Sequence, residues 1–299
     1  MKHTLLAILL QIGFFSFSPC QSNLTGESEW GQHKFVEYLP GNLPIIISVP
    51  HGGSLNPEII ADRTFGVDVK DNGTQEVARE MMTEFNRRTG KIPFMIFSHL
   101  HRKKLDVNRE EFEGAQENET ALTAWKEYHG CIDSATASVR RMFGGGMLID
   151  LHGQRHPEER IEIGYRFESE ELALDDEDLN SAENIEKSSL KNLLKQSSFT
   201  LAELIRGKKS MGALFDGHNV RSTPSPSDPF PKSYKYFSGG YTIFRHAAED
   251  TTTIFGMQLE LNYELRSSEN IHSTAVMLTD VIIEYMNMQF GKNYTIGLK

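Results

Sequence analysis

Two short aliphatic runs, each stopped by a histidine and a glycine, constrain most strongly what this chain can fold into. The first, IIISVPHGG, begins at Ile45, and the second, MLIDLHG, begins at Met147. Continuous apolar runs of this length are typical of strands buried on both faces, and proline and glycine end them abruptly. His51 and His152 are therefore expected at the carboxyl ends of core strands, where open α/β sheets collect their ligands.

The rest of the chain alternates between helical and extended patterns. Apolar residues recur every four positions in residues 72–88, which predicts a helix there. A long helix, or two helices broken near Gly130, is predicted over residues 119–143. The remaining strands are predicted within 91–100, 161–167 and 251–262, and further helices within 189–207 and 269–290. This alternation predicts an α/β layered fold.

Two segments interrupt the alternation. Residues 168–187 are dense in acidic side chains, and such a charge run is typical of a solvated surface excursion. Residues 217–240 are rich in proline and serine. A loop of this length inside a compact domain is typical of an active-site cover or a binding loop.

The amino terminus has the pattern of a secretory signal peptide. The apolar run LLAILLQIGFFSF follows Lys2 and His3, and small residues come next, so we predict a signal peptide over 1–20 and an N-terminal segment over 21–43. No other segment is long and apolar enough to span a bilayer, so we expect a secreted chain that does not bind a membrane after cleavage. Four sequons permit N-glycosylation, at Asn23, Asn72, Asn118 and Asn293.

Length and charge narrow the class of protein further. The segment 44–299 has the size of one large domain. A formal net charge of −10 argues against nucleic acid and against an anionic membrane as partners. A small anionic substrate remains compatible with this charge, because a local cationic pocket can lie within an acidic protein.

The two histidines predict a zinc site, since zinc binds imidazole nitrogen and carboxylate oxygen and keeps an open position when it is catalytic. Asp150 precedes His152 by two residues and could orient its ring. A third ligand should be an acid. Glu58, Asp71 and Glu76 are the candidates near His51; we favour Asp71, whose alternative role is capping the helix that follows.

Two further stretches carry candidate catalytic groups. The stretch RKKLDVNRE contains Asn108 and Arg109, and an arginine presents a planar fork that suits a carboxylate. The strand GMQLELN contains Glu260. The alternation of side chains along this strand does not by itself decide which of its two faces is exposed to solvent. Close to zinc, Glu260 would suit a general base.

The motifs SVPHGG, DVNRE, LIDLHGQ and MQLELN, in this order, resemble those of the N-formylglutamate amidohydrolase family, which is related to the zinc carboxypeptidases. The resemblance extends from about residue 44 to 288. It implies a three-layer α/β/α sandwich on a mixed central sheet. It also implies hydrolysis of an N-acyl or amide bond next to a carboxylate, with N-formyl-L-glutamate as the type substrate. The runner-up activities are a carboxypeptidase or a γ-glutamyl hydrolase, and the alternative of another class is a non-catalytic carboxylate-binding protein.

The resemblance also implies roles for individual residues. Zinc would be held by His51, His152 and one acid, and Arg109, helped by Asn108, would grip the substrate carboxylate. Glu260 matches the catalytic glutamate of the carboxypeptidases. Tyr241, in the stretch FSGGY, resembles part of the pocket-covering loop, with a strand-entry aromatic as the alternative. The carboxypeptidase motif has glutamate three residues after its first histidine, where this chain has Ser54, so the third ligand must come from further along.

Overall fold

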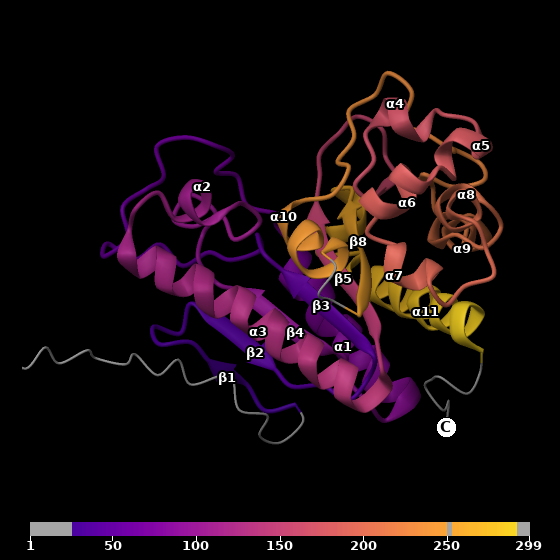
Figure 1. The fold of residues 1–299 in the computed structure, drawn as a ribbon. Helices are drawn as coiled ribbons and strands as arrows, with labels where there is room; N and C mark the ends of the chain where they lie inside the picture. The colour runs from indigo at the N-terminus through magenta and orange to yellow at the C-terminus, as the bar shows by residue number, and fades with distance from the viewer. Residues whose placement is uncertain (1–25, 250–252, 292–299) are drawn as a thin grey trace, which may run out of the picture.

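The computed structural model describes residues 26–249 and 253–291. The predicted signal peptide and two of the sequons, at Asn23 and Asn293, lie outside the described residues. One sheet runs through the molecule (Figure 1) with the strand order β1-β2-β4-β3-β5-β8-β6-β7. The strands are β1 (Glu29–Trp30), β2 (Val36–Leu39), β3 (Ile45–Val49), β4 (Phe94–Ser98), β5 (Gly146–Gly153), β6 (Ile161–Gly164), β7 (Ser222–Thr223) and β8 (Ile254–Leu261).

The sheet is mixed. Strands β4, β3, β5 and β8 are parallel, and their residues are buried on both faces, as the aliphatic runs predict. Strand β2 runs antiparallel to β4, and β6 runs antiparallel to β8. The predicted N-terminal segment 21–43 therefore contributes β1 and β2 to the same sheet as the predicted domain 44–299.

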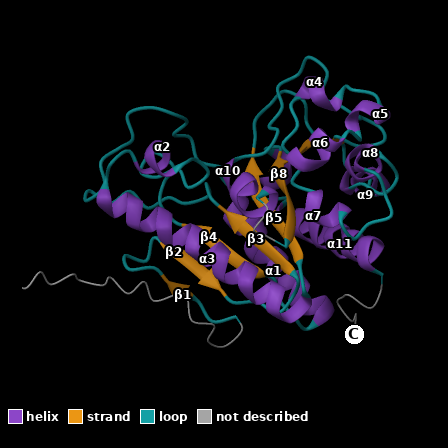
Figure 2. Cartoon of the chain, viewed as in Figure 1, coloured by secondary structure: helices purple, strands orange, loops and turns teal. Residues whose placement is uncertain are grey.

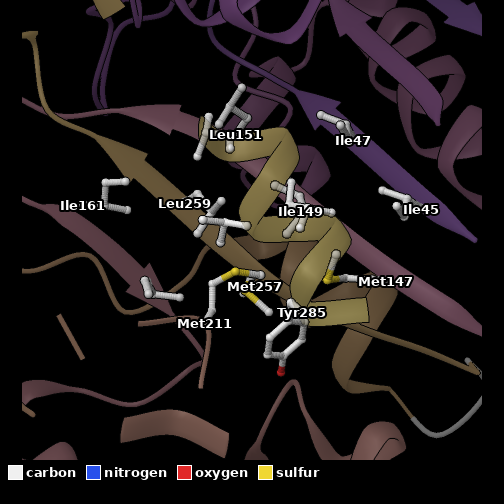
Figure 3. Close-up of a cluster of buried hydrophobic side chains, with 14 of the residues drawn as sticks. Ile45, Ile47, Met147, Ile149, Leu151, Ile161, Met211, Met257, Leu259 and Tyr285 are labelled. Carbon is white, nitrogen blue, oxygen red and sulfur yellow. The ribbon is translucent and has the colours of Figure 1, made fainter. Parts of the chain in front are cut away.

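Helices cover both faces of the sheet (Figure 2). Helices α1 (Thr74–Thr89) and α11 (Ile271–Phe290) pack on the face to which Ile45, Ile149 and Leu259 point, together with Tyr285 of α11 (Figure 3). Helix α3 (Glu119–Phe143) packs on the opposite face. The predicted three-layer α/β/α sandwich with a mixed sheet is thus confirmed.

The shorter helices lie beyond the carboxyl ends of the parallel strands or beside the sheet. They are α2 (Glu111–Ala115), α4 (Ser169–Leu172), α5 (Asp176–Leu179), α6 (Ala182–Lys187), α7 (Lys191–Leu194), α8 (Leu201–Arg206), α9 (Met211–Gly217) and α10 (Tyr241–Ile243). Helix α10 continues into the π-helical turn η1 (Phe244–Ala248). A 3-10 turn, η2 (Glu264–Arg266), follows β8. Figure 1 shows α4 to α9 gathered on the side of the molecule away from α2. No described helix is long and apolar enough to cross a membrane.

The structure decides three local predictions. Helix α3 is continuous through Gly130, so the first of the two alternatives, one long helix, is confirmed. The acidic segment folds into α4, α5 and α6, which bury Leu172 and Leu179 under an otherwise charged surface. Helix α1 begins after Gly73, whose φ of 88° is left-handed, so Gly73 is the N-cap and the capping alternative for Asp71 is wrong.

Candidate metal centre

Three predicted ligands meet at the carboxyl ends of β3 and β5. Asp71 Oδ2 lies 3.5 Å from His51 Nδ1 and 3.4 Å from His152 Nδ1. All three side chains are buried, and their ligand atoms lie within 4.8 Å of one another. The other two acids considered, Glu58 and Glu76, are exposed and outside this group.

A buried aspartate orients each imidazole through its other nitrogen. His152 Nε2 lies 2.8 Å from Asp150 Oδ2, as the sequence predicts. His51 Nε2 lies 2.7 Å from Asp106 Oδ1, an acid that the sequence analysis did not single out. The sequence does contain a pattern that could have identified Asp106. It lies two residues before Asn108, just as Asp150 lies two residues before His152. Both rings therefore direct Nδ1 to the same point beside Asp71.

The donor set fits a divalent cation. His51 Nδ1 is buried and has no hydrogen-bond partner among the described residues, as expected of an atom that needs a ligand. Burial by itself would raise the pKa of Asp71, but the interactions with the two imidazoles, at 3.4 and 3.5 Å, outweigh burial and lower it. Burial would lower the pKa of His152, but Asp150 and Asp71 raise it well above its usual value. These carboxylates favour positive charge at the centre, and two imidazoles with one carboxylate suit zinc.

A second group of potential ligands, Glu80, Glu84 and His272, lies between α1 and α11 near the surface. Its members already have partners. Glu84 binds Arg87 and Arg88, and His272 Nδ1 lies 2.6 Å from Glu80 Oε1. A cation would have to displace these contacts, so the buried triad is the better site.

Glu260 lies next to the triad, with its Oε1 3.9 Å from His152 Nδ1. The strands β5 and β8 pair His152 with Glu260, so both side chains leave the sheet on the same face, that of α3. Burial, reinforced by Asp71 and Glu162, raises the pKa of Glu260 to about 8 despite the opposing effect of His152. Gln258 Nε2 donates a hydrogen bond to Glu260 Oε1 over 2.9 Å and fixes the carboxyl group.

Asn108 is buried beside the centre. Its Nδ2 lies 3.3 Å from His152 Nε2, and its Oδ1 accepts a hydrogen bond from the backbone N–H of Thr242 over 2.8 Å. Asn108 thus joins the stretch after β4 to the start of α10, and its amide is occupied by contacts within the protein.

Arg109 directly follows Asn108 in the chain, and its side chain is about one third exposed (34%). Its Nε donates to Glu113 Oε1 over 3.1 Å and its Nη1 to the carbonyl of Asn108 over 2.8 Å. Arg102 was missed by the sequence analysis although it opens the same stretch. Its Nε donates to Asp106 Oδ2 over 2.9 Å, and its charge opposes the rise in the pKa of Glu260.

Tyr241 begins α10 and not a strand, so the strand-entry alternative is wrong. Its ring packs at 5.5 Å, edge-on, against His129 and at 5.9 Å from Trp125, both of α3. The loop before it lies on β6, where Phe237 N–H donates to Glu162 Oε2 over 2.9 Å. The predicted covering loop 217–240 therefore rests on the strand next to β8.

The comparisons with known proteins concern the fold. No protein-family model matches the chain, and no curated protein is similar to it in sequence. A gene product of Agrobacterium tumefaciens has a similar structure, with a TM-score of 0.53 and 13% identity over 87% of this chain and 96% of its own. An N-formylglutamate amidohydrolase from Ralstonia eutropha has a TM-score of 0.50 and 13% identity over 83% of this chain and 96% of its own. The chain thus has the α/β fold seen in an N-formylglutamate amidohydrolase, the fold that its four motifs imply.

Proposed function

We propose that this protein is a secreted, zinc-dependent hydrolase of an amide or N-acyl bond next to a carboxylate, with N-formyl-L-glutamate as the first substrate to test. The observation that carries this proposal is the position of Glu260, whose Oε1 is 3.9 Å from His152 Nδ1 at the edge of the buried triad. A binding protein needs no acid at that point, whereas hydrolysis needs a base beside the reacting atoms. The fold shared with an N-formylglutamate amidohydrolase supports the same choice of substrate.

His51, Asp71 and His152 would hold the ion, with Asp106 and Asp150 fixing the two imidazoles. When bound, zinc would supply a Lewis acid that polarises the substrate carbonyl and acidifies a water molecule. Glu260 would take the proton from the attacking water and deliver it to the leaving amine. The charge of the ion would also favour the ionised form of Glu260, which this role requires.

Arg109 is proposed to bind the carboxylate next to the scissile bond. A substrate carboxylate would compete with Glu113 for its guanidinium, and one third of that side chain is exposed (34%) for this contact. Arg102 is held by Asp106 close to Glu260 and would place a second positive charge beside the reacting carbonyl.

The deciding experiment measures metal and turnover in the same preparation. Purified protein should contain zinc and release formate from N-formyl-L-glutamate, and a chelator should abolish the activity until zinc is restored. A peptide with a free carboxyl terminus and a γ-glutamyl peptide serve as alternative substrates. Zinc-replete protein that hydrolyses none of the three would contradict the proposed activity.

Secretion is tested separately. The protein should be recovered from the medium of expressing cells with its new amino terminus near residue 21, as determined by mass spectrometry. An intact amino terminus on protein retained inside the cells would contradict this part of the proposal.

A further inference from the structure

Two buried histidines outside the candidate metal centre, His129 of α3 and His246 of η1, lie in direct contact. Their rings stack with centroids 5.1 Å apart, and His129 Nδ1 lies 2.8 Å from His246 Nε2. His129 is 1% exposed and His246 is 4% exposed. The proposed reaction uses neither ring. A π-helical turn such as η1 is rare and frequently marks a functional site, so the pair calls for an explanation.

Hydrogen bonding assigns the proton of His129. Its Nε2 lies 2.9 Å from the carbonyl of Val107, which can only accept, so Nε2 carries a proton. Burial, reinforced by His246 and Arg245, lowers the pKa of His129 well below its usual value, so the ring is neutral and has no second proton. His129 Nδ1 is then an acceptor, and His246 Nε2 must donate to it.

Asp133 supports this assignment from the other side of His246. Its Oδ1 accepts hydrogen bonds only, and it lies 3.2 Å from His246 Nδ1, while Arg245 Nη2 lies 3.8 Å from its Oδ2. A His246 ring with protons on both nitrogens can donate to His129 and pair with Asp133 at once. Both partners belong to α3, so His246 ties η1 to that helix at two points.

A tryptophan one turn earlier on α3 makes the same kind of contact as His129. Trp125 Nε1 donates a hydrogen bond to the carbonyl of Arg109 over 2.9 Å. The rings of Trp125 and His129 pack with centroids 4.2 Å apart. Helix α3 thus holds the backbone at Val107 and at Arg109, on either side of Asn108.

The backbone held in this way carries two side chains that contact the predicted metal ligands. Asp106 Oδ1 lies 2.7 Å from His51 Nε2, and Asn108 Nδ2 lies 3.3 Å from His152 Nε2. A shift of residues 106–109 would therefore disturb both imidazoles. Groups of this kind orient metal ligands, and their loss typically costs about 10- to 100-fold in metal affinity or activity.

The same pair of histidines also meets the element that holds Asn108 from the other side. The ring of Tyr241 packs edge-on against His129 at 5.5 Å. The next residue, Thr242, donates its backbone N–H to Asn108 Oδ1 over 2.8 Å, and α10 then continues into η1 with His246. His129 therefore lies between the stretch 106–109 and the α10–η1 element, and contacts both.

We propose that His129 is a positioning residue for the reaction, and that His246 sets the tautomer in which His129 holds the stretch 106–109. The inference rests on the proposed hydrolase function and adds to it a support that lies behind the metal centre. In the opposite tautomer, the lone pair of His129 Nε2 would face the carbonyl of Val107 and repel it. The stretch that carries Asp106 and Asn108 would then be released.

NMR of the imidazole nitrogens tests the assigned tautomer in the wild-type protein without any turnover. The ¹⁵N shifts of His129 should show a protonated Nε2 and an unprotonated Nδ1. The Nε2–H should exchange slowly with solvent, because it is buried and hydrogen-bonded. A His129 ring protonated at Nδ1 would overturn the proposal.

Two substitutions of similar size separate positioning from packing. His246→Gln keeps an N–H that can donate to His129, whereas His246→Leu keeps the volume and has no donor. With zinc saturating, His246→Leu should lower kcat about tenfold or more with little change in KM, and His246→Gln should retain most of the activity. Packing alone would make leucine at least as good as glutamine, because a buried amide without a partner is costly. Equal kcat in the two variants would overturn the proposal.

His246→Met takes the place of His246→Leu if the leucine variant fails to fold, because methionine also lacks a donor and adapts to irregular gaps.

The side-chain amide of Asn108 separates this inference from the proposed reaction. Its NMR signals should keep their positions in His246→Gln and shift in His246→Leu. If wild-type protein hydrolyses nothing but these signals respond as expected, the positioning stands and the proposed reaction is wrong. If hydrolysis continues equally in both variants and the Asn108 signals do not move, the positioning is wrong and the hydrolase stands.

Discussion

At the scale of single residues, His51 and His152 are expected to determine how much zinc the protein binds. Replacing either histidine with alanine removes one imidazole from a buried set of three donors, so zinc per chain should fall sharply, as measured by elemental analysis. His218→Ala is the control, because the His218 side chain is partly exposed (28%), lies outside the triad and has its Nε2 3.8 Å from Glu284 Oε1. Full zinc occupancy in both His51→Ala and His152→Ala would remove the central claim.

Glu260 is expected to govern turnover and not metal binding. Glu260→Gln preserves size and hydrogen bonding with Gln258 but removes the base, and such groups typically contribute about 10²- to 10⁴-fold to rate. The substitution should lower kcat by that order with zinc content unchanged. Loss of zinc in Glu260→Gln would instead identify Glu260 as a metal ligand.

At the scale of elements, α10 is expected to hold Asn108 in place. Gly240 precedes α10, and a Cβ added there would overlap the side-chain amide of Asn108. Gly240→Ala should therefore displace Asn108 from His152 while zinc is retained. Loss of a group that contacts a metal ligand typically lowers activity about tenfold or more, so kcat should fall by that order.

The matched control for this element is Gly217→Ala at the end of α9, where no neighbouring atom lies within 4 Å of an added Cβ. Equal kcat in the two alanine variants would show that the contact between α10 and Asn108 has no part in the reaction.

At the scale of the whole molecule, Glu37 is expected to contribute to acid sensitivity. Burial would raise its pKa, but hydrogen bonds from His99, Arg79 and Ser28 outweigh burial and lower it to about 2. A carboxyl group with a lowered pKa stabilises the fold above its ordinary pKa, and this contribution is lost as the pH falls from about 4.5 to about 2. Glu37→Gln should therefore lower the free energy of unfolding by at most about 3 kcal/mol at pH 7.

The difference between wild type and Glu37→Gln should be largely lost near pH 2, where the carboxyl group is protonated in the unfolded state and half protonated in the folded state. Urea unfolding at several pH values measures it, with Glu27→Gln, an exposed substitution on the same edge, as the control. A difference that stays constant from pH 7 to pH 2 would show that Glu37 acts through packing and not through its charge.

The sequence by itself determined the features that depend on local pattern. The aliphatic runs of β3 and β5, the glycines that end them and the alternation with helices were enough to predict the sheet and to place His51 and His152 at strand ends. Asp150 was predicted as the partner of His152 because two residues along one strand return to the same face.

Only the tertiary structure decided the features that depend on how distant segments meet. The sequence left Asp71 as either a metal ligand or a helix cap. In the structure α1 begins only after the left-handed Gly73, and the Asp71 carboxylate lies beside both histidines. The pairing of β5 with β8 put Glu260 beside His152. Periodicity encodes which face a side chain takes, but the register between strands and the packing of loops are set by the whole chain.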